Sequence, residues 1–285
     1  MSCSDGTVGR AARAGLAAAT ATRLTRVALE MATRSGDLRW TRTNHRGAPI
    51  SLLEGPSVAV GLVVGALVGG PGRAGAAGAV AAAGAAAFGL VDDLSEDAGR
   101  TRKGLRGHLG ALVHGELTTG GLKVLGIGAT ALVAAAIATP VPPAAEGSRT
   151  RWLGDVVASG VLIAATANLV NLLDLRPGRA LKAGMLVAVP ALATSGSPAA
   201  AACLGAAAAA IGPDLGERDM LGDGGANALG ALVGTAAVLG APRPVRLGLL
   251  AAVVGLTFAS ERISFTKVIA RTPVLREIDA WGRPG

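Results

Sequence analysis

Polar residues that could handle phosphate groups or metal ions interrupt the apolar stretches of this sequence at three places. The first is the adjacent pair Asp92 and Asp93, which directly follows an apolar run. Successive side chains on a helix point about 100° apart, so one carboxylate can face a metal while its neighbour faces a cation or a substrate. Oxygen ligands that leave coordination positions for substrate phosphates suit Mg²⁺. A hydrated pair that only marks the end of a helix is the alternative interpretation.

The second cluster places Asn168, Asn171 and Asp174 at every third position, at the end of another apolar run. This spacing puts the three side chains on one slowly drifting stripe of a helix, where all of them can face the interior of a bundle. Two carboxamides and a carboxylate suit the base and ribose of a nucleotide. Hydrogen bonding between helices, a common role of Asn in membranes, is the alternative. Three cations follow this cluster: Arg176, Arg179 and Lys182. They would either hold phosphates or only mark a cytoplasmic loop, as the positive-inside rule predicts.

The third cluster contains Asp223, which lies between Gly222 and Gly224 at the start of a run of small residues. Glycine lets a backbone or a ligand come close to the carboxylate, and a helix N-terminus favours anionic ligands. A plain loop–helix junction with Asp as its N-cap is the alternative. Lys123, at the start of another apolar run, would reach a substrate phosphate or extend to the membrane interface.

The composition predicts that these residues are positioned by membrane-spanning helices. Of 285 residues, 51% are hydrophobic and only 16% are charged, with a mean hydropathy of +0.50; soluble domains carry about 25% charged residues. Since one span takes about 20 apolar residues, we expect an all-α, polytopic transmembrane helix bundle of roughly eight to ten spans. The predicted spans are Pro56–Gly70, Ala74–Val91, Gly121–Thr139, Leu153–Leu173, Ala180–Thr194, Pro198–Ile211, Ala226–Leu239 and Leu247–Ala259.

The ends of the chain are less regular. The segment Ala11–Ala32 has a helical pattern but contains three arginines, so it is a weak first span or an interfacial helix. We expect one integral membrane domain, 1–285, in which 1–55 holds this segment and a cytoplasmic loop, 56–260 the bundle, and 261–285 a cytoplasmic tail. Cys3 and Cys203 are too few for a disulfide framework or a metal site.

The charges predict an orientation in the cell membrane. The formal charge is +8, and most of the 27 basic residues lie in alternate loops between the predicted spans. The positive-inside rule places those loops in the cytoplasm, together with all three polar clusters. Short arginine-containing loops between apolar runs favour membrane topology over nucleic-acid binding.

Taken in order, the three clusters resemble the motifs of the polyprenyl-phosphate N-acetylhexosamine-1-phosphate transferase family (glycosyltransferase family 4), which includes phospho-N-acetylmuramoyl-pentapeptide transferase. The resemblance covers roughly Arg42 to Trp281. Gly89–Leu94 is similar to the family's Asp-Asp motif at the end of its third span. Asn168–Asp174 is similar to its Asn-x-x-Asn-x-x-Asp motif, and Met220–Gly230 to its Met-Gly-Asp-x-Gly-Ser segment.

The resemblance implies transfer of a sugar 1-phosphate from a UDP-sugar to a polyprenyl phosphate, with release of UMP, in the synthesis of cell-envelope polysaccharide or glycoconjugates. Asp92, Asp93 and Asp223 would form the acidic catalytic centre, with Asp223 as the Mg²⁺ ligand. Asn168, Asn171 and Asp174 would bind the uridine end of the donor, and Lys123 a phosphate. A homodimer is compatible with this activity.

The chain departs from the family pattern in ways that bear on its substrate. Members that act on the muramoyl-pentapeptide carry a His-rich motif in the last cytoplasmic loop, whereas Ala270–Asp279 contains no histidine. The Gly-Ser of the last motif is replaced by Gly225-Ala226. These differences argue against the pentapeptide substrate. They also keep open a non-catalytic relative that binds lipid or nucleotide, and a multi-pass transporter with polar residues at its span ends.

Overall fold

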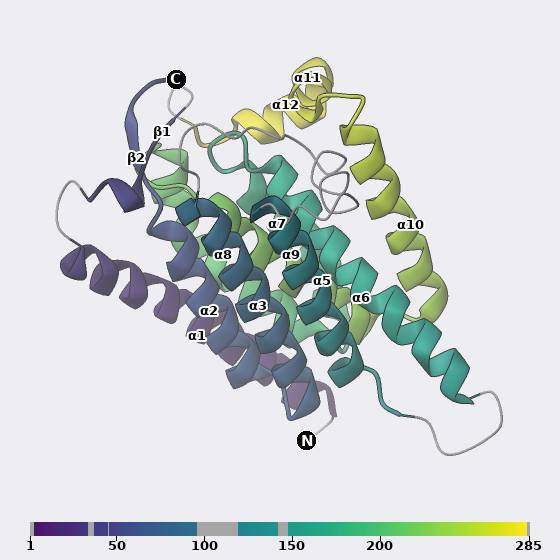
Figure 1. Ribbon diagram of the computed structural model, residues 1–285. Coiled ribbons are helices and arrows are strands. Elements are labelled where there is room, and N and C mark those ends of the chain that lie inside the picture. The colour runs from purple at the N-terminus through teal and green to yellow at the C-terminus, as the bar shows by residue number, and fades with distance from the viewer. Residues whose placement is uncertain (1–2, 34–36, 45, 96–118, 142–147, 284–285) are drawn as a thin grey trace.

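The computed structural model describes residues 3–33, 37–44, 46–95, 119–141 and 148–283 (Figure 1). The described chain is an all-α bundle, as the sequence predicts, with one short antiparallel hairpin at one end. Its elements are α1 (Cys3–Ala32), η1 (Leu38–Trp40), β1 (Thr41–Thr43), β2 (Pro49–Ser51), α2 (Glu54–Gly69), α3 (Arg73–Ser95), α5 (Thr119–Ala138), α6 (Ser148–Leu173), α7 (Arg179–Ala188), η2 (Val189–Ala193), α8 (Ser197–Leu215), α9 (Gly222–Gly240), α10 (Arg243–Ser260), α11 (Phe265–Arg271) and α12 (Pro273–Ala280).

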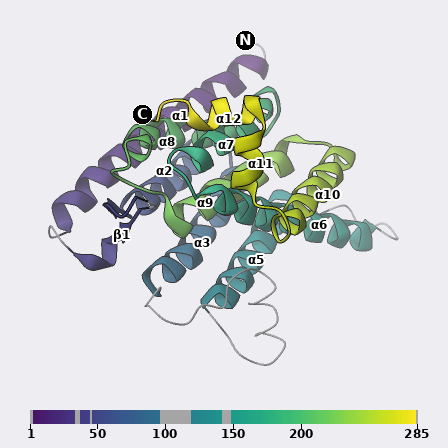
Figure 2. The same cartoon turned by 90° about the horizontal axis from the view of Figure 1, so that it is seen from above.

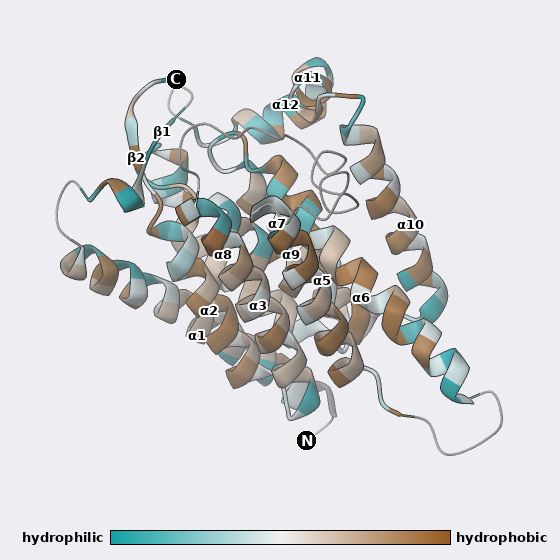
Figure 3. Ribbon diagram, in the orientation of Figure 1, coloured by the Kyte–Doolittle hydropathy of each residue, from teal (hydrophilic) through white to brown (hydrophobic). Residues whose placement is uncertain are grey.

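Five of these helices are long and apolar enough to cross a membrane: α3, α5, α6, α8 and α10. The shorter α2 is also apolar. Figure 3 shows hydrophobic residues along the middle of the bundle and hydrophilic residues gathered toward its ends. This distribution is the one expected of helices whose midsections face hydrocarbon.

One predicted span is not a continuous α-helix. The stretch predicted over Ala180–Thr194 consists of α7, which ends at Ala188, and the 3-10 helix η2. Pro190 accounts for the change, because proline lacks an N–H and clashes with the preceding turn. At about 1.5 Å per α-helical residue and about 2 Å per 3-10 residue, the two pieces together extend about 25 Å.

Helix α9 lies at the centre of the bundle and positions the candidate site. Most of its residues are buried, and it packs against α3 and α6. Small residues make these contacts close: a Cβ at Gly230 would lie 2.5 Å from the Thr166 carbonyl oxygen, and one at Gly234 would lie 2.9 Å from Ile163. Small residues allow membrane helices to pack backbone against backbone.

The first and last helices complete the bundle. Helix α1 packs against α2 and α8, and its Ala14, Ala18 and Thr22 face the successive glycines Gly69, Gly65 and Gly61 of α2. The part of the segment Ala11–Ala32 from Ala14 to Thr22 therefore packs into the bundle, along about two turns of α2. The predicted tail, 261–285, forms α11 and α12, which lie across the end of the bundle near α7 (Figure 2).

Candidate functional site

Residues from two of the polar clusters, together with Lys123, meet at one end of the bundle, which we call the acidic end. Asp92 and Asp93 lie in the last turn of α3, Lys123 in the first turns of α5, and Asp223 in the first turn of α9. The Lys123 Nζ lies 2.7 Å from Asp92 Oδ2 and also donates a hydrogen bond to Asp223 Oδ2. One ammonium group therefore joins carboxylates that are 131 positions apart in the sequence.

Asp93 has a different partner from Asp92. Its Oδ1 accepts a hydrogen bond from the backbone N–H of Asp223 (2.9 Å), and its Oδ2 accepts one from the N–H of Gly224 (2.8 Å). The residue that precedes α9, Leu221, provides no side-chain cap. The first N–H groups of a helix have no partner within the helix and carry partial positive charge. Asp93 thus caps α9 from a neighbouring helix and fixes the position of Asp223.

Two glycines make this arrangement possible. A Cβ at Gly89, one turn before the aspartate pair, would lie 2.3 Å from the Asp223 carbonyl oxygen. Gly222 has a φ of 59°, which L side chains rarely adopt, and a Cβ there would lie 3.0 Å from the Asp93 carboxylate. The glycines that border the aspartates therefore let α3 and the start of α9 approach closely enough for the carboxylate contacts.

The second polar cluster is divided by the structure. Asp174 lies just beyond α6, and its carboxylate interacts with the backbone amide of Gly222. Burial, reinforced by the carboxylates of Asp214 and Asp223, raises the pKa of Asp174 well above its usual range. Asn168 and Asn171 are partly exposed on α6. Their carboxamides form no hydrogen bond within the described part of the chain, so Asp174 joins the acidic end while the two amides remain available to a ligand.

A second acidic group beside this site was not predicted. Glu54, the first residue of α2, is only 2% exposed. Neither of its carboxylate oxygens meets the strict geometry of a hydrogen bond to a described residue, but its carboxyl group lies beside that of Asp214, close enough for the two to share a proton. It interacts electrostatically with Asp214, Asp219 and Asp174. The available signal was an acid directly before an apolar run, where a carboxylate is costly unless it has a role.

Arg26 and Arg42 were also missed as members of this end. Arg26, from the last part of α1, binds both carboxylate oxygens of Asp219 at 2.8 and 3.0 Å. Arg42, from β1, donates a hydrogen bond to the carbonyl oxygen of Asp93. Both arginines belong to a basic segment that the positive-inside rule already explains. No further signal in the sequence therefore pointed to their contacts with Asp219 and Asp93.

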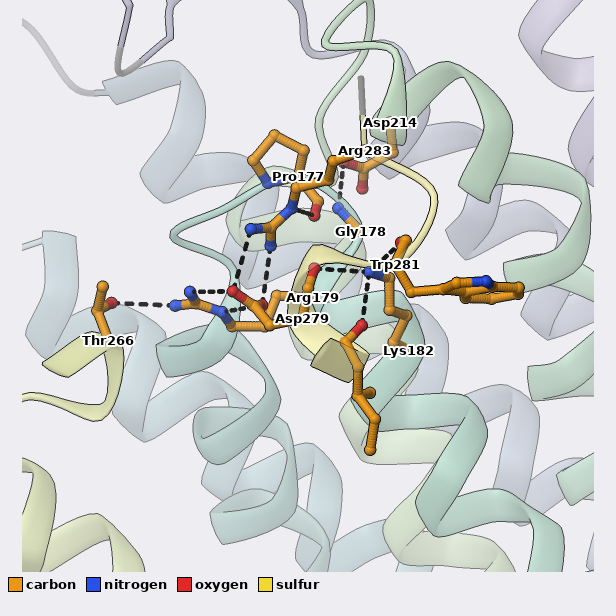
Figure 4. Close-up of polar contacts among 10 residues, drawn as sticks. Pro177, Gly178, Arg179, Lys182, Asp214, Thr266, Asp279, Trp281 and Arg283 are labelled. Carbon is orange, nitrogen blue, oxygen red and sulfur yellow. Dashed lines mark hydrogen bonds and ion pairs between the residues drawn. The ribbon is translucent and has the colours of Figure 1, made fainter. Parts of the chain in front are cut away.

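Two of the three cations that follow the second cluster, Arg179 and Lys182, bind the chain's own C-terminal segment (Figure 4). Arg179 holds both carboxylate oxygens of Asp279 at 2.7 and 2.9 Å, and Arg283 binds the same carboxylate. Lys182 Nζ donates to three carbonyl oxygens at the end of α12: Ile278 (3.0 Å), Asp279 (2.8 Å) and Trp281 (2.7 Å). Arg179 and Lys182 are both buried. Their observed role is to hold α12 against α7.

The fit of a metal ion depends on Asp92 and Asp223. Among the described residues no group of three or more His, Cys, Asp or Glu side chains is arranged to hold a metal ion. Two carboxylates do converge, and a cation, the Lys123 ammonium, lies between them. Mg²⁺ is usually bound by one or two carboxylates together with water and substrate phosphates. The donor set is therefore sufficient for Mg²⁺ only when a phosphate substrate contributes the remaining oxygens.

The acidic end thus combines carboxylates, cations and free carboxamides at one end of a bundle of apolar helices. Comparisons with known proteins do not identify the chain: no family model matches it, and no curated protein matches its sequence. Its function has to be inferred from the chemistry of its own residues.

Proposed function

We propose that the chain is a membrane transferase that moves a sugar 1-phosphate from a UDP-sugar to a polyprenyl phosphate and releases UMP. The observation that supports this most strongly is the convergence of Asp92, Lys123 and Asp223, from three different helices, beside Asp93 and Asp174. The order of the motifs along the sequence resembles that of the transferase family, and the convergence is what a shared phosphate site requires.

In the proposed reaction, an oxygen of the polyprenyl phosphate attacks the phosphorus that carries the sugar. The bond between that phosphorus and the oxygen bridging to the uridine-bearing phosphate breaks, and UMP leaves with the bridging oxygen. The product is a lipid-linked pyrophosphate that carries the sugar. No oxidation or reduction occurs, and the proton balance is limited to any proton on the lipid phosphate.

The two aspartates of α3 would have separate roles. Asp93 has both oxygens bound to the start of α9 and would act as a positioning residue for Asp223. Asp92 contacts only side chains, among them the flexible ammonium of Lys123, in the described part of the chain, and it would orient the lipid phosphate or accept its proton. Lys123 would stabilise the negative charge of the phosphates. Asp174 and the carboxamides of Asn168 and Asn171 would hold the uridine.

Mg²⁺ is part of the proposal. Asp223, with Asp92 beside it, would hold the ion, which would neutralise pyrophosphate charge and stabilise the leaving UMP. For this to happen the Lys123 ammonium must turn from the carboxylates toward a phosphate oxygen. Its position on a flexible four-carbon stem permits that exchange.

A non-catalytic relative that binds nucleotide or lipid is the second candidate. One observation favours it: the Lys123 ammonium already pairs with both Asp92 and Asp223, and the described residues include no three-ligand metal group. Such a protein would bind UMP or UDP-sugar and give no lipid-linked product. Binding without turnover would therefore distinguish it from the transferase.

The test is a transfer assay in membranes that contain the full-length protein and added polyprenyl phosphate. A UDP-N-acetylhexosamine labelled in its sugar should give label in the lipid fraction when Mg²⁺ is present and none when EDTA replaces it. The Asp223→Asn variant should lose this activity. The matched control is Glu261→Gln, which removes an exposed acid just beyond α10 and should leave activity unchanged.

Absence of lipid product with every common UDP-N-acetylhexosamine, together with measurable UMP binding, would favour the non-catalytic candidate. Equal activity of wild type and Asp223→Asn would exclude the acidic end as the site of transfer.

A further inference from the structure

A cavity lies at the opposite end of the bundle from the acidic end. It has a volume of about 250 Å³, is partly open, and is bordered by the first turns of α1, the turn between α2 and α3, the start of α8 and the end of α9. Helix α3 connects the two ends, since its first turn borders the cavity at Ala74 and its last turn carries Asp92 and Asp93. At about 1.5 Å per residue, its length is roughly that of the hydrocarbon core of a bilayer.

Arg10 gives this cavity a positive charge. The residue is partly buried, and one of its terminal nitrogens donates a hydrogen bond of 3.1 Å to Thr7 Oγ1. Its Nε is fully buried and finds no hydrogen-bond partner among the described residues. Leaving a donor on a charged group buried and unsatisfied is costly, so such groups normally have an acceptor. No described residue that lines the cavity is acidic.

The rest of the lining favours an anion with an apolar body. Helices α3 and α8 both begin at the cavity, and the partial positive charge of a helix N-terminus adds to that of Arg10. Most of the other lining residues are apolar, among them Ala66, Pro198 and Leu239. A free inorganic ion would satisfy the arginine but would leave these surfaces against water.

We propose that this cavity binds the phosphate of a membrane lipid, with the Arg10 guanidinium as the main anion-binding group and the apolar walls in contact with the start of the lipid chains. A planar guanidinium that offers several N–H donors suits phosphate. The position of the cavity, about one bilayer thickness from the acidic end, matches the level of lipid headgroups on the other side of the membrane. The proposal does not depend on transferase activity.

The test measures lipid binding to the purified full-length protein in detergent by native mass spectrometry. Phosphatidic acid is compared with diacylglycerol of the same chains, which lacks only the phosphate. Arg10→Gln is compared with Arg13→Gln, which removes the same charge from an exposed position one turn further along α1. Wild type should retain phosphatidic acid in preference to diacylglycerol. Arg10→Gln should bind it about tenfold more weakly or worse, and Arg13→Gln should behave as wild type.

A second variant keeps the proposal testable if Arg10→Gln is unstable. Ala74→Leu adds bulk to the cavity wall and leaves Arg10 in place, and it should also weaken retention of phosphatidic acid. The proposal is wrong if Ala74→Leu binds the lipid as wild type does, or if Arg10→Gln and Arg13→Gln lose binding equally. A melting temperature raised as much by inorganic phosphate as by phosphatidic acid would assign the cavity to free phosphate and overturn the lipid assignment.

Discussion

At the scale of single residues, the adjacent aspartates Asp92 and Asp93 differ in what they contact. Because they are consecutive residues of a helix, the sequence predicts only that their side chains point in different directions. The structure shows Asp93 bound to two backbone amides of α9 and Asp92 bound to the ammonium of Lys123. Substituting each in turn should therefore have different effects.

Asp93→Ala should lower the free energy of unfolding by about 1–2 kcal/mol, which is the usual effect of losing a helix cap. Asp92→Ala should reduce transfer while changing stability less, because Asp223 continues to pair with Lys123. Thermal unfolding in detergent, measured beside the transfer assay, separates the two effects. Equal destabilisation by both substitutions would contradict the division of roles.

Lys123→Met should leave two carboxylates close together without a cation between them. The side chains of Lys123 and Asp223 are 17% and 28% exposed, so the loss of stability should be smaller than the roughly 3–5 kcal/mol measured when a fully buried pair is broken. If Asp92 and Asp223 can hold Mg²⁺, then Mg²⁺ should stabilise this variant more than it stabilises wild type.

Melting temperatures across a Mg²⁺ titration, with K⁺ at matched ionic strength as the control, measure this effect. Stabilisation by K⁺ equal to that by Mg²⁺ would show that only general screening is involved.

The sequence predicted several residues of the acidic end. Asp92, Asp93 and Asp223 were identified as acids at the ends of apolar runs that face one compartment, and the resemblance to the transferase family added Lys123 to the same site. Glu54 was not identified, because a single acid before an apolar run is also an ordinary helix start. Its burial beside the carboxyl groups of Asp214 and Asp219 depends on contacts from α8 and the hairpin end, which no local pattern reveals.

At the scale of elements, the close approach of α3 and α9 depends on Gly89. A Cβ at this position would lie 2.3 Å from the Asp223 carbonyl oxygen. Gly89→Ala should push the two helices apart, lower stability by about 1–3 kcal/mol as overpacking does, and reduce transfer by displacing Asp223 from Asp93.

The matched control is Gly128→Ala on α5, where an added Cβ meets nothing within 4 Å. That substitution should be neutral or stabilising, because alanine favours helix over glycine. Unfolding experiments on both variants test the comparison, and a harmless Gly89→Ala would contradict the packing described.

The attachment of α12 to α7 should depend on pH. Burial tends to raise the pKa of Asp279, but hydrogen bonds from Arg179 and Arg283 outweigh it, and the net pKa lies below its usual range. A carboxyl whose pKa is lowered by folding contributes stability above its unfolded pKa of about 3.9, and this contribution is lost as the pH falls through the folded pKa.

Hydrogen–deuterium exchange of residues 273–281 measures that attachment. Asp279→Asn should lower the protection of these amides at pH 7. Acidification should lower their protection, taken relative to the intrinsic exchange rate at each pH, more in wild type than in the variant. Glu277→Gln, an exposed change on the same helix, is the control. Unchanged exchange in Asp279→Asn would show that the ion pairs do not hold α12.

Helix positions could be predicted because long apolar runs between charges have few other interpretations. The predicted Leu153–Leu173 and Ala226–Leu239, for example, fall within α6 and α9. The hairpin of β1 and β2 was not expected. It depends on non-local backbone contacts: Ser51 N–H donates to the Arg218 carbonyl, and Met220 N–H donates to Ser51. The folding of α12 onto α7 likewise depends on side chains about 100 positions apart in the sequence.

At the scale of the whole molecule, the two ends of the bundle have different chemistry. One end carries the carboxylates and the hairpin, and the other carries Arg10 and its cavity. The distribution of basic residues predicts that the acidic end faces the cytoplasm.

Single cysteines at exposed positions of the two ends test this orientation. Leu175 is 64% exposed at the acidic end, and Val141 is 61% exposed beyond the end of α5 that lies away from it. In a Cys3→Ser background, with Cys203 buried, a membrane-impermeant thiol reagent added to intact cells should modify Val141→Cys and not Leu175→Cys. The reverse pattern would place the acidic end outside.

The central claim concerns which bond breaks at the acidic end, and UDP-sugar labelled in one phosphate at a time tests it directly. With wild-type protein, polyprenyl phosphate and Mg²⁺, label in the phosphate next to the sugar should enter the lipid, and label in the phosphate next to uridine should be released as UMP. Release of both labels as UDP would mean that only the sugar is transferred. That result, or equal transfer by Asp223→Asn, would contradict the proposed function.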